Sequence, residues 1–345
     1  MKVHKPIFLF SRLTHFILHS QIEKTITYDL PVIVFGDHTC NVKYINFPFG
    51  AGADGIKILK SKDNILSKYL FYGTQYLVFR LHDRGYARHY QHIEKMDLFV
   101  PPIEEQHRIV SRIEEMFSQL DSAVETLQKT KQQLEVYRQA VLKEVFDSCK
   151  CKVKVEDVCI YVSDGDHMPP PKSATGIPFI MISNIQNNHI FWDNTAFVSR
   201  DYFDNITDKR KPKRGDVLYT VTGSFGIPVL VDYDKEFCFQ RHIALLRPNE
   251  RIMQKYLYYV MQNPIVYEQA RKKATGTAQK TVSLSVLRKI EIPFVESLEE
   301  QEKIVFDIEN KMSVCDRISI IIKDTLQQAE AMRQSILKQA FEGEL

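Results

Sequence analysis

Residues 103–146 read IEEQHRIVSRIEEMFSQLDSAVETLQKTKQQLEVYRQAVLKEVF, and residues 298–341 repeat this stretch as LEEQEKIVFDIENKMSVCDRISIIIKDTLQQAEAMRQSILKQAF. Aligned without a gap, at an offset of about 195 residues, the two copies agree at about 18 of 44 positions. The agreements include Gln106/Gln301, Asp121/Asp316 and Arg138/Arg333. A repeat of this strength indicates that the chain is built from two related units.

Each copy lacks Gly and Pro and is rich in Glu, Gln, Lys, Arg, Leu and Ile, a composition typical of one long helix. At a rise of about 1.5 Å per residue, such a helix is roughly 66 Å long. An apolar residue recurs every seven positions, which predicts that the two helices pair along a seam as in a coiled coil. Two unrelated surface helices are the plainer alternative, which the matched sequences disfavour. The seam consists of Ile113, Leu120, Leu127, Leu134 and Val141 in the first copy and Ile308, Cys315, Ile322, Ala329 and Ile336 in the second.

The charge of the chain is divided unequally. A length of 345 residues allows two or three domains, and the formal net charge is +3. The two repeated stretches hold 12 Lys and Arg against 16 Asp and Glu, whereas the remainder holds 34 against 27. Positive charge is therefore concentrated outside the long helices, which favours a polyanionic partner for the globular parts. An ordinary solvated basic surface is the alternative.

The cysteines do not predict a metal site, and no stretch predicts a membrane span. The six cysteines form no CxxC pair, and Cys149-Lys-Cys151 alone is a poor zinc site. No apolar run reaches the roughly 18–20 residues that a span needs. The first 20 residues lack the small-residue cleavage site of a signal peptide. We expect a cytoplasmic protein that binds no metal.

Outside the repeated stretches, the pattern predicts two globular regions. The expected boundaries are 1–102 for the first domain, 103–149 for the first long helix, 150–296 for the second domain and 297–345 for the second long helix. In the first domain we expect a helix over residues 65–79 and strands over residues 30–35, 42–47, 56–59 and 96–100. In the second we expect helical sequence over residues 253–273, broken at Pro264, and strands over residues 177–183, 215–220, 227–231, 237–246 and 289–293.

The repeat extends into the two globular regions. LSKYLFY at residues 66–72 aligns with MQKYLYY at residues 253–259, and IKIL at residues 56–59 aligns with IALL at residues 243–246. The repeating unit is therefore a globular domain followed by a long helix. The first domain has no counterpart of residues 165–183, so we expect it to be a shortened version of the second.

No motif predicts catalysis. The chain has no GxxxxGK[ST] loop and no GxGxxG loop, which argues against a self-contained nucleotide enzyme. His38 follows Asp37 and His167 follows Asp166, so each pair could act in acid–base chemistry. Neither pair is accompanied by a nucleophile or a metal framework, and both read more simply as polar groups of loops. We therefore predict no catalytic residue.

Several short stretches predict contact with nucleic acid. The stretch RDYFDNITDKRKPKR, residues 200–214, combines six basic residues with two aromatic ones and suits phosphate contact, although any solvated loop can be basic. Gln240, Arg241 and His242 carry side chains that can reach base edges. Strand alternation would point Arg241 away from its two neighbours. The full set of candidates is His38, Tyr86, Arg88, His89, Tyr90, Lys209, Arg210, Lys211, Lys213, Arg214, Ser224, Gln240, Arg241, His242 and Lys280.

These motifs, in this order, resemble those of the specificity subunit of type I restriction-modification enzymes. The resemblance rests on PPIEEQHRIV and its echo SLEEQEKIV, which enter the long helices, and on RQAVLKEVF and RQSILKQAF, which close them. It also rests on GDHMPPPKSATGIPFIMISNI, GDVLYTVTGSFG, FQRHIALLRP and GTAQKTVSLSVLRKI in the second domain and on LPVIVFGDHT and GYARHY in the first. It covers roughly residues 30–345.

The resemblance implies an α+β protein with two mixed α/β target-recognition domains, separated by two long antiparallel, coiled-coil-like helices in a pseudo-two-fold repeat. Each domain would read half of a bipartite site in double-stranded DNA. Two modification subunits would bring S-adenosylmethionine, and restriction subunits would bring ATP hydrolysis with Mg and DNA cleavage. The chain itself would bind no cofactor and catalyse nothing.

Residues 1 to about 27 depart from the openings that this family shows. If the first domain is truncated, the subunit would read a single half-site or be inactive alone. A stand-alone restriction–methylation enzyme would need a cofactor loop and a catalytic tetrapeptide, which the chain lacks. A helical scaffold that joins protein partners without binding DNA is the alternative from another class.

Overall fold

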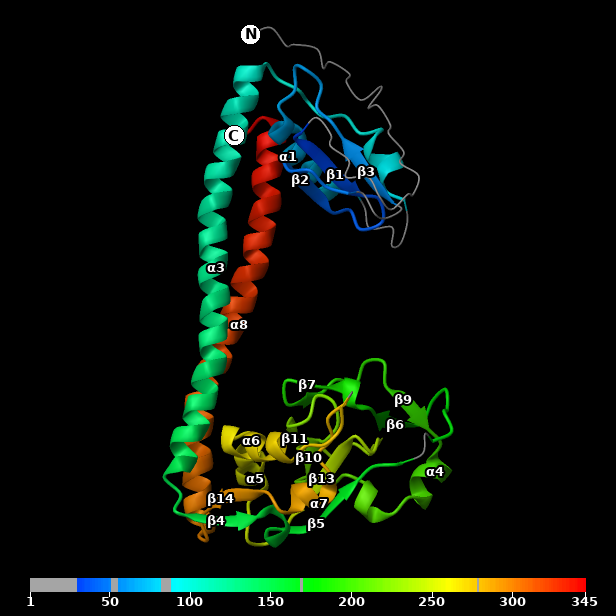
Figure 1. Cartoon of the computed structure of the whole chain (residues 1–345), viewed down its shortest axis with the longest axis vertical. Coiled ribbons are helices and arrows are strands. Elements are labelled where there is room, and N and C mark those ends of the chain that lie inside the picture. Colours follow the sequence, from blue (N-terminus) through cyan, green and yellow to red (C-terminus); the bar gives the residue numbers. More distant parts are fainter. Residues whose placement is uncertain (1–29, 51–54, 82–87, 168–169, 278) are drawn as a thin grey trace. The chain divides into compact units, whose positions relative to one another are not determined.

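The computed structural model describes residues 30–50, 55–81, 88–167, 170–277 and 279–345. They form two compact units, the first built from residues up to 130 together with 321–345 and the second from residues 131–320. The two long helices, α3 (Ile103–Asp147) and α8 (Leu298–Glu342), each contribute a segment to both units (Figure 1). No described helix is both long enough and apolar enough to cross a membrane.

Each long helix has 45 residues, as the composition of the repeat predicts. Both begin with a pair of glutamates in the first turn, Glu104 and Glu105 in α3 and Glu299 and Glu300 in α8. Negative charge there is favourable because the N-terminal end of a helix carries partial positive charge. All ten residues of the expected seam are buried or half-buried.

Two ion pairs show the direction in which segments of α3 and α8 pair within each unit. In the second unit Arg138 of α3 donates to Asp316 of α8 at 2.5 Å, and in the first unit Arg333 of α8 donates to Asp121 of α3. Arg138 and Arg333 are equivalent positions of the repeat, and so are Asp121 and Asp316. The segments therefore pair in opposite directions, and one pair is the symmetry mate of the other. In these reciprocal ion pairs the aspartates are exposed and the arginines half-buried, so the pairs fix register more than they add stability.

The first unit packs a small sheet against α1 and the long helices. Strands β1 (Val32–Gly36), β2 (Val42–Ile45) and β3 (Ile56–Leu59) form an antiparallel sheet in the order β2-β1-β3. Helix α1 is Ser67–Phe79 and the short α2 is Tyr90–Ile93. The buried cluster of this unit includes Phe35, Leu77 and, from the long helices, Ile113 and Phe341.

The strand expected over residues 96–100 is absent from the first unit. The carbonyl of Phe99 accepts a hydrogen bond from the Tyr69 hydroxyl at 2.7 Å, and Leu98 is buried beside Gly73 of α1. The segment is thus held by a side-chain hydrogen bond and by packing on α1, and not by a ladder of backbone hydrogen bonds. Alternation of apolar residues cannot distinguish these two cases.

The second unit contains two main sheets. The first has the order β11-β10-β13-β5 and the second the order β12-β6-β9, while β14-β4 and β7-β8 are separate antiparallel pairs. The strands are β4 (Cys151–Lys154), β5 (Cys159–Asp164), β6 (Ile177–Ile180), β7 (Ile185–Gln186), β8 (His189–Ile190), β9 (Ala196–Val198), β10 (Val217–Thr220), β11 (Pro228–Leu230), β12 (Cys238–Phe239), β13 (Ile243–Pro248) and β14 (Glu291–Phe294). The helices besides α3 and α8 are α4 (Arg200–Asn205), α5 (Gln254–Val260), α6 (Pro264–Lys273) and α7 (Leu284–Arg288).

A buried glutamine joins α3 to the globular part of the first unit. The carbonyl of the Gln106 side chain accepts the backbone N–H of Leu66, the N-cap of α1, at 2.9 Å. Its amide donates to the carbonyls of Asn64 and Pro101, each at 2.9 Å. Gln106 is fully buried, so all three partners would be unsatisfied without it.

Gln301 makes the same arrangement in the second unit. Its carbonyl accepts the N–H of Met253, the N-cap of α5, at 2.8 Å. Its amide donates to the carbonyls of Arg251 at 2.8 Å and Val295 at 2.9 Å. We call this arrangement the amide clamp. It explains physically why both copies of the repeat carry EEQ at the start of the long helix.

The aromatic contacts repeat in the same way. The ring of Tyr69 in α1 lies 5.0 Å from that of Phe341, and the ring of Tyr256 in α5 lies 5.4 Å from that of Phe146. Both tyrosine hydroxyls donate to a backbone carbonyl near the start of the following long helix. The predicted repeat of a globular domain followed by a long helix is thus present in the packing of both units.

Candidate nucleic-acid interface

The second unit turns sharply at Gln240, Arg241 and His242. Strand β12 ends at Phe239, and Ile243, the first residue of β13, donates its N–H to the carbonyl of Gln240 at 3.0 Å. The continuous strand expected over residues 237–246 is therefore wrong. Strand β12 belongs to one sheet and β13 to the other, so the chain passes between sheets at this turn and keeps the three polar residues outside the core.

The side chains of the turn point in different directions. Gln240 Nε2 lies 2.9 Å from His242 Nδ1, whereas Arg241 is exposed. Burial, and then the charge of Arg241, lowers the pKa of His242. His242 is therefore mainly neutral at neutral pH. When the amide donates to Nδ1, the imidazole proton is on Nε2, which makes that nitrogen a donor.

A glycine allows the loop after β5 to approach this turn. A Cβ atom on Gly165 would lie 1.9 Å from the carbonyl oxygen of Phe239, so no other residue fits there without a shift of the backbone. The neighbouring Asp166 accepts the N–H of Arg241 at 3.1 Å through its backbone carbonyl. The loop therefore places Asp166 and His167 beside the turn.

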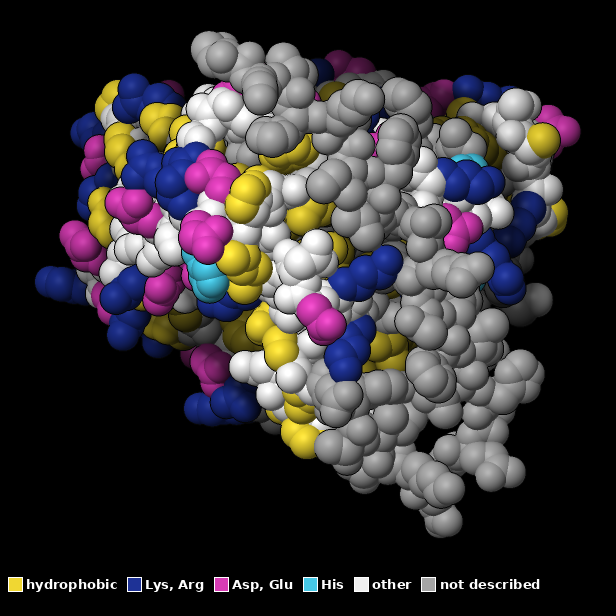
Figure 2. Space-filling model, turned by 90° about the horizontal axis from the view of Figure 1, so that it is seen from above, with side chains coloured by type: hydrophobic (Ala, Val, Ile, Leu, Met, Phe, Trp, Pro, Cys, Tyr) yellow, Lys and Arg dark blue, Asp and Glu magenta, His cyan; other side chains and the backbone are white. Residues whose placement is uncertain are grey.

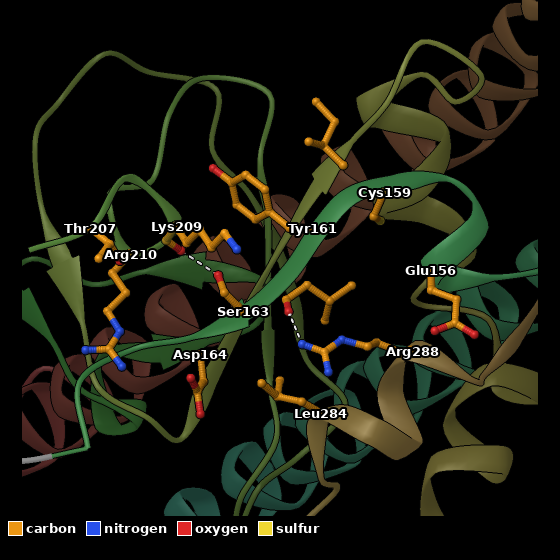
Figure 3. A pocket seen from close by; sticks show the side chains of 12 residues that line it. Glu156, Cys159, Tyr161, Ser163, Asp164, Thr207, Lys209, Arg210, Leu284 and Arg288 are labelled. Atoms are coloured by element: carbon orange, nitrogen blue, oxygen red, sulfur yellow. Dashed lines mark hydrogen bonds between the residues drawn. The ribbon is translucent and has the colours of Figure 1, made fainter.

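Three adjoining clefts surround these residues. The first, of about 600 Å³, is lined by β5, by residues 207–210 and by α7 (Figure 3). The second, of about 330 Å³, shares Asp164 and Leu284 with the first and includes Thr222, Gln279 and Thr281. The third, of about 320 Å³, has an apolar floor and shares His167, Arg241 and His242 with the second. We call these three clefts together the second-domain groove.

Two arginines that line the second-domain groove lack a carboxylate partner. All eight arginines between residues 150 and 296 are described, and Arg241 and Arg288 are the two for which the structure shows no ion pair. The other six are paired with acidic side chains: Arg200, Arg210, Arg214, Arg247, Arg251 and Arg271. Unpaired guanidinium groups in a groove are free to bind phosphate or base edges.

The basic stretch at residues 200–214 is more strongly neutralised than the sequence suggests. Arg210 donates to the carboxylate of Asp166 at 2.7 Å, and the hydroxyl of Tyr202 donates to the same group. Arg214 pairs with Asp234 at 2.8 Å. Of the remaining candidates, Lys213 lies 3.6 Å from Asp208, Lys211 donates to the carbonyl of Asp204, and the ammonium of Lys209 lies over the ring of Tyr161.

A buried ion pair holds this stretch against the sheet. Arg247 of β13 makes two hydrogen bonds to Asp216, at 2.7 and 2.6 Å, and Asp216 also accepts the N–H of Lys213 at 2.7 Å. The side chains are 15% and 3% exposed. Arg247 also donates to the carbonyl of Lys211 and lies over the ring of Tyr161 at 4.8 Å.

Ser224 and Lys280 lie next to residues that line the second-domain groove. The N–H of Gly223 donates to the carbonyl of Lys280 at 2.9 Å, which brings the loop at 222–226 beside the segment at 279–281. Both Ser224 and Lys280 are exposed. They are thus close to Gln279, which lines the second-domain groove and belongs to the stretch 277–281, a predicted phosphate-capable loop.

The DNA-contact candidates of the first unit differ in how far they are buried. His89 and Tyr90 are 5% and 6% exposed, so the structure places these two candidates in the core. Their segment is fixed by Asp37, whose side chain accepts the N–H of Tyr90 at 2.8 Å and whose carbonyl lies 3.0 Å from His89 Nδ1. Arg88 is exposed and His38 half-buried. Tyr86 lies outside the described residues.

Cys159 and Cys238 are buried thiols of the second unit. Burial raises the pKa of Cys159 to about 12, and burial followed by the charge of Asp166 raises that of Cys238 to about 12. Both thiols are therefore protonated at neutral pH and are poor nucleophiles. Across the described residues, no three His, Cys, Asp or Glu side chains converge as a metal site would require.

On the described face in Figure 2, Lys and Arg side chains alternate with Asp and Glu.

Comparisons with known proteins agree on one family. The family model for the type I restriction modification DNA specificity domain matches residues 148–331, which is more than half of the chain. The specificity subunit of the type I restriction enzyme EcoBI from Escherichia coli is 25% identical over 275 residues, which is 71% of this chain and 58% of that protein. The specificity subunit of MjaVIII from Methanocaldococcus jannaschii is 23% identical over 83% of this chain and 72% of that protein. The alignment thus spans less than two thirds of the Escherichia coli relative.

One solved structure supports the fold. It was described as the structural basis of complex assembly and conformational transition of the type I R-M system. The likeness has a TM-score of 0.68 at 19% identity and covers 91% of this chain and 82% of that one. The predicted α+β fold, with two mixed domains and two long paired helices, is confirmed. The domain boundaries and the candidate site residues stay predictions.

Proposed function

Because the chain belongs to the family of the type I restriction modification DNA specificity domain, we propose that it is the subunit that recognises the DNA sequence in a type I restriction-modification enzyme. The observation that carries this proposal is the position of the second-domain groove within the matched residues 148–331. The groove presents the unpaired Arg241 on a turn, flanked by Gln240 and His242. Arg, Gln and His side chains can read base edges in the major groove of DNA.

The chain acts in this proposal without chemistry of its own. Phosphate contacts position the domain, and the turn at 240–242 reads the bases. Two modification subunits supply S-adenosylmethionine and the methyl transfer, and restriction subunits supply ATP hydrolysis with Mg and cleavage. The complex works in the cytoplasm on double-stranded DNA. The first unit reads the other half of a bipartite site, with Arg88 and His38 as its remaining described candidates.

The test is to co-express the chain with its modification subunit and map methylated bases in the genome of the host. A bipartite methylated motif supports the proposal, with both domains reading DNA. A motif that corresponds to one half-site, or to a palindrome built from it, would show that only the second domain reads. A complex that assembles but neither methylates nor binds DNA would favour the scaffold alternative.

Arg241→Ala is expected to weaken binding to the specific site by about 1–3 kcal/mol, because the variant loses a base contact. Binding to unrelated duplex should change little. Electrophoretic mobility or fluorescence anisotropy of the assembled complex would measure both affinities. Arg271→Ala is the matched control, since it removes the same charge from a side chain that is paired with Glu268 and is not a predicted DNA contact. Equal losses for the two variants would argue against base reading by Arg241.

A further inference from the structure

We propose that the first cleft of the second-domain groove binds a phosphate of the nucleic-acid backbone, held between Arg288 and Lys209. The inference rests on the proposed function and adds a site and a residue, Arg288, that the sequence did not single out. Figure 3 shows that the two cations reach the cleft from different elements, Arg288 from α7 and Lys209 from the basic stretch.

Arg288 is held in place before any ligand binds. Its Nη2 donates to the backbone carbonyl of Val162 in β5 at 2.7 Å, and its neighbour Leu287 is fully buried. The guanidinium has five N–H donors, and this bond uses one of them. The remaining donors face a cleft in which no described carboxylate pairs with Arg288. A fixed, planar group with free donors suits the bidentate binding of a phosphate.

Lys209 is fixed through its backbone. Its carbonyl accepts the hydroxyl of Ser163 at 2.5 Å, which ties the basic stretch to β5. Its ammonium lies 5.8 Å from the centre of the Tyr161 ring, and the side chain is exposed. No ion pair of Lys209 is shown in the described part of the chain. The cleft therefore holds two cations available to a ligand.

The other charged groups of this cleft are already engaged. Arg210 is paired with Asp166 at 2.7 Å. Asp164 lies 2.8 Å from His167 and Glu156 lies 3.9 Å from Lys154. The acidic side chains thus have partners outside the cleft, whereas Lys209 and Arg288 do not. A ligand with negative charge gains most by binding between these two.

The arrangement of the clefts favours a polymer over a free anion. The first cleft shares the lining residues Asp164 and Leu284 with the second, which is also lined by Arg241 and His242. A strand whose phosphate lies between Arg288 and Lys209 can therefore extend towards the turn that reads bases. This division of work, with phosphate contacts that position and base contacts that specify, is general for DNA-binding proteins.

The test measures how the affinity of the assembled complex for a duplex falls with salt. Each phosphate contact contributes about 0.9 to the slope of log K against log salt for duplex DNA. Arg288→Gln and Lys209→Gln should each reduce the slope by about 1 and weaken specific and unrelated duplexes equally. Arg271→Gln, which removes the same charge from a side chain paired with Glu268, should leave the slope unchanged.

The outcomes separate this inference from the proposed function. If the wild-type complex binds duplex in a salt-dependent way but both cleft variants keep its slope, the phosphate site is wrong and DNA recognition stands. If the wild-type complex does not bind duplex, the proposed function is wrong, and the phosphate site that rests on it is wrong too. If inorganic phosphate binds the wild-type complex and not the Arg288→Gln variant, while both bind duplex with the same affinity and slope, the cleft is a free-anion site and the backbone assignment is wrong. Lys209 is exposed, so its variant remains informative if Arg288→Gln unfolds.

Discussion

Asp216→Ala is expected to lower the free energy of unfolding of the second unit by about 3–5 kcal/mol, because it leaves a buried charge without its partner. Asp216 is 3% exposed and accepts two hydrogen bonds from Arg247 and one from the N–H of Lys213. With the carboxylate gone, the guanidinium stays between β13 and the ring of Tyr161 with one carbonyl partner. The basic stretch also loses its attachment to the sheet.

Trp192 makes this measurement specific to one unit. It is the single tryptophan of the chain and packs against Tyr233 and Phe237 in the second unit. Urea unfolding followed by its fluorescence therefore reports that unit. Asp234→Ala, which breaks an exposed pair with Arg214, is the control and should leave the midpoint unchanged.

A double replacement tests the physical reason. Asp216→Leu with Arg247→Met removes both charges and keeps an apolar filling, so it should recover much of the stability that Asp216→Ala loses. If the urea midpoint of Asp216→Ala is as high as that of the control variant, the pair of Asp216 and Arg247 is solvated in solution. The pair then does not anchor the basic stretch.

Gln301→Ala is expected to cost the second unit about 3 kcal/mol, because three backbone groups lose the buried side chain that satisfies them. These are the N–H of Met253 and the carbonyls of Arg251 and Val295. Gln106→Ala should cost the first unit a similar amount, since Gln106 makes the same three bonds there. The two variants are matched because they change equivalent positions of one repeat.

Two probes would tell the amide clamps apart. Gln301→Ala should shift the fluorescence transition of Trp192, whereas Gln106→Ala should appear in calorimetry and leave that transition nearly in place. Gln301→Met tests whether shape alone suffices, since it keeps the volume and removes the hydrogen bonds. Full stability of the methionine variant would show that the hydrogen bonds of the amide clamp contribute nothing beyond packing.

The parts of the fold that the sequence predicted are those that local composition controls. Gly-free, Pro-free stretches with an apolar residue every seven positions can form little else than long paired helices, and α3 and α8 do so. Pro264 begins α6 as its first residue, as its missing N–H favours. The matched LSKYLFY and MQKYLYY likewise become α1 and α5.

The errors arose where distant segments decide the structure. Residues 96–100 alternate like a strand, but the Tyr69 hydroxyl takes the carbonyl that a ladder would use. The apolar run on both sides of Gln240 reads as one strand, although its two ends belong to different sheets. Composition likewise cannot show that Tyr90 and His89 are buried, since that depends on Asp37 and on packing against β1.

The site was predicted in part. Arg241 is predicted because Gln, Arg and His side chains can reach base edges, and it does line the second-domain groove. Arg288 was missed because nothing next to it in the sequence is aromatic or glycine-rich. Its interest comes from lying unpaired across β5 from a lysine about 80 residues away in sequence, a proximity that only the fold creates.

The reciprocal ion pairs bear on how genes of this kind can exchange parts. Each pair joins an arginine from one copy of the repeat to an aspartate from the other, and both copies carry both residues. A recombinant that takes either half from a relative with the same two residues therefore restores both pairs without a compensating change. The paired helical segments can then stay constant while the globular regions diverge.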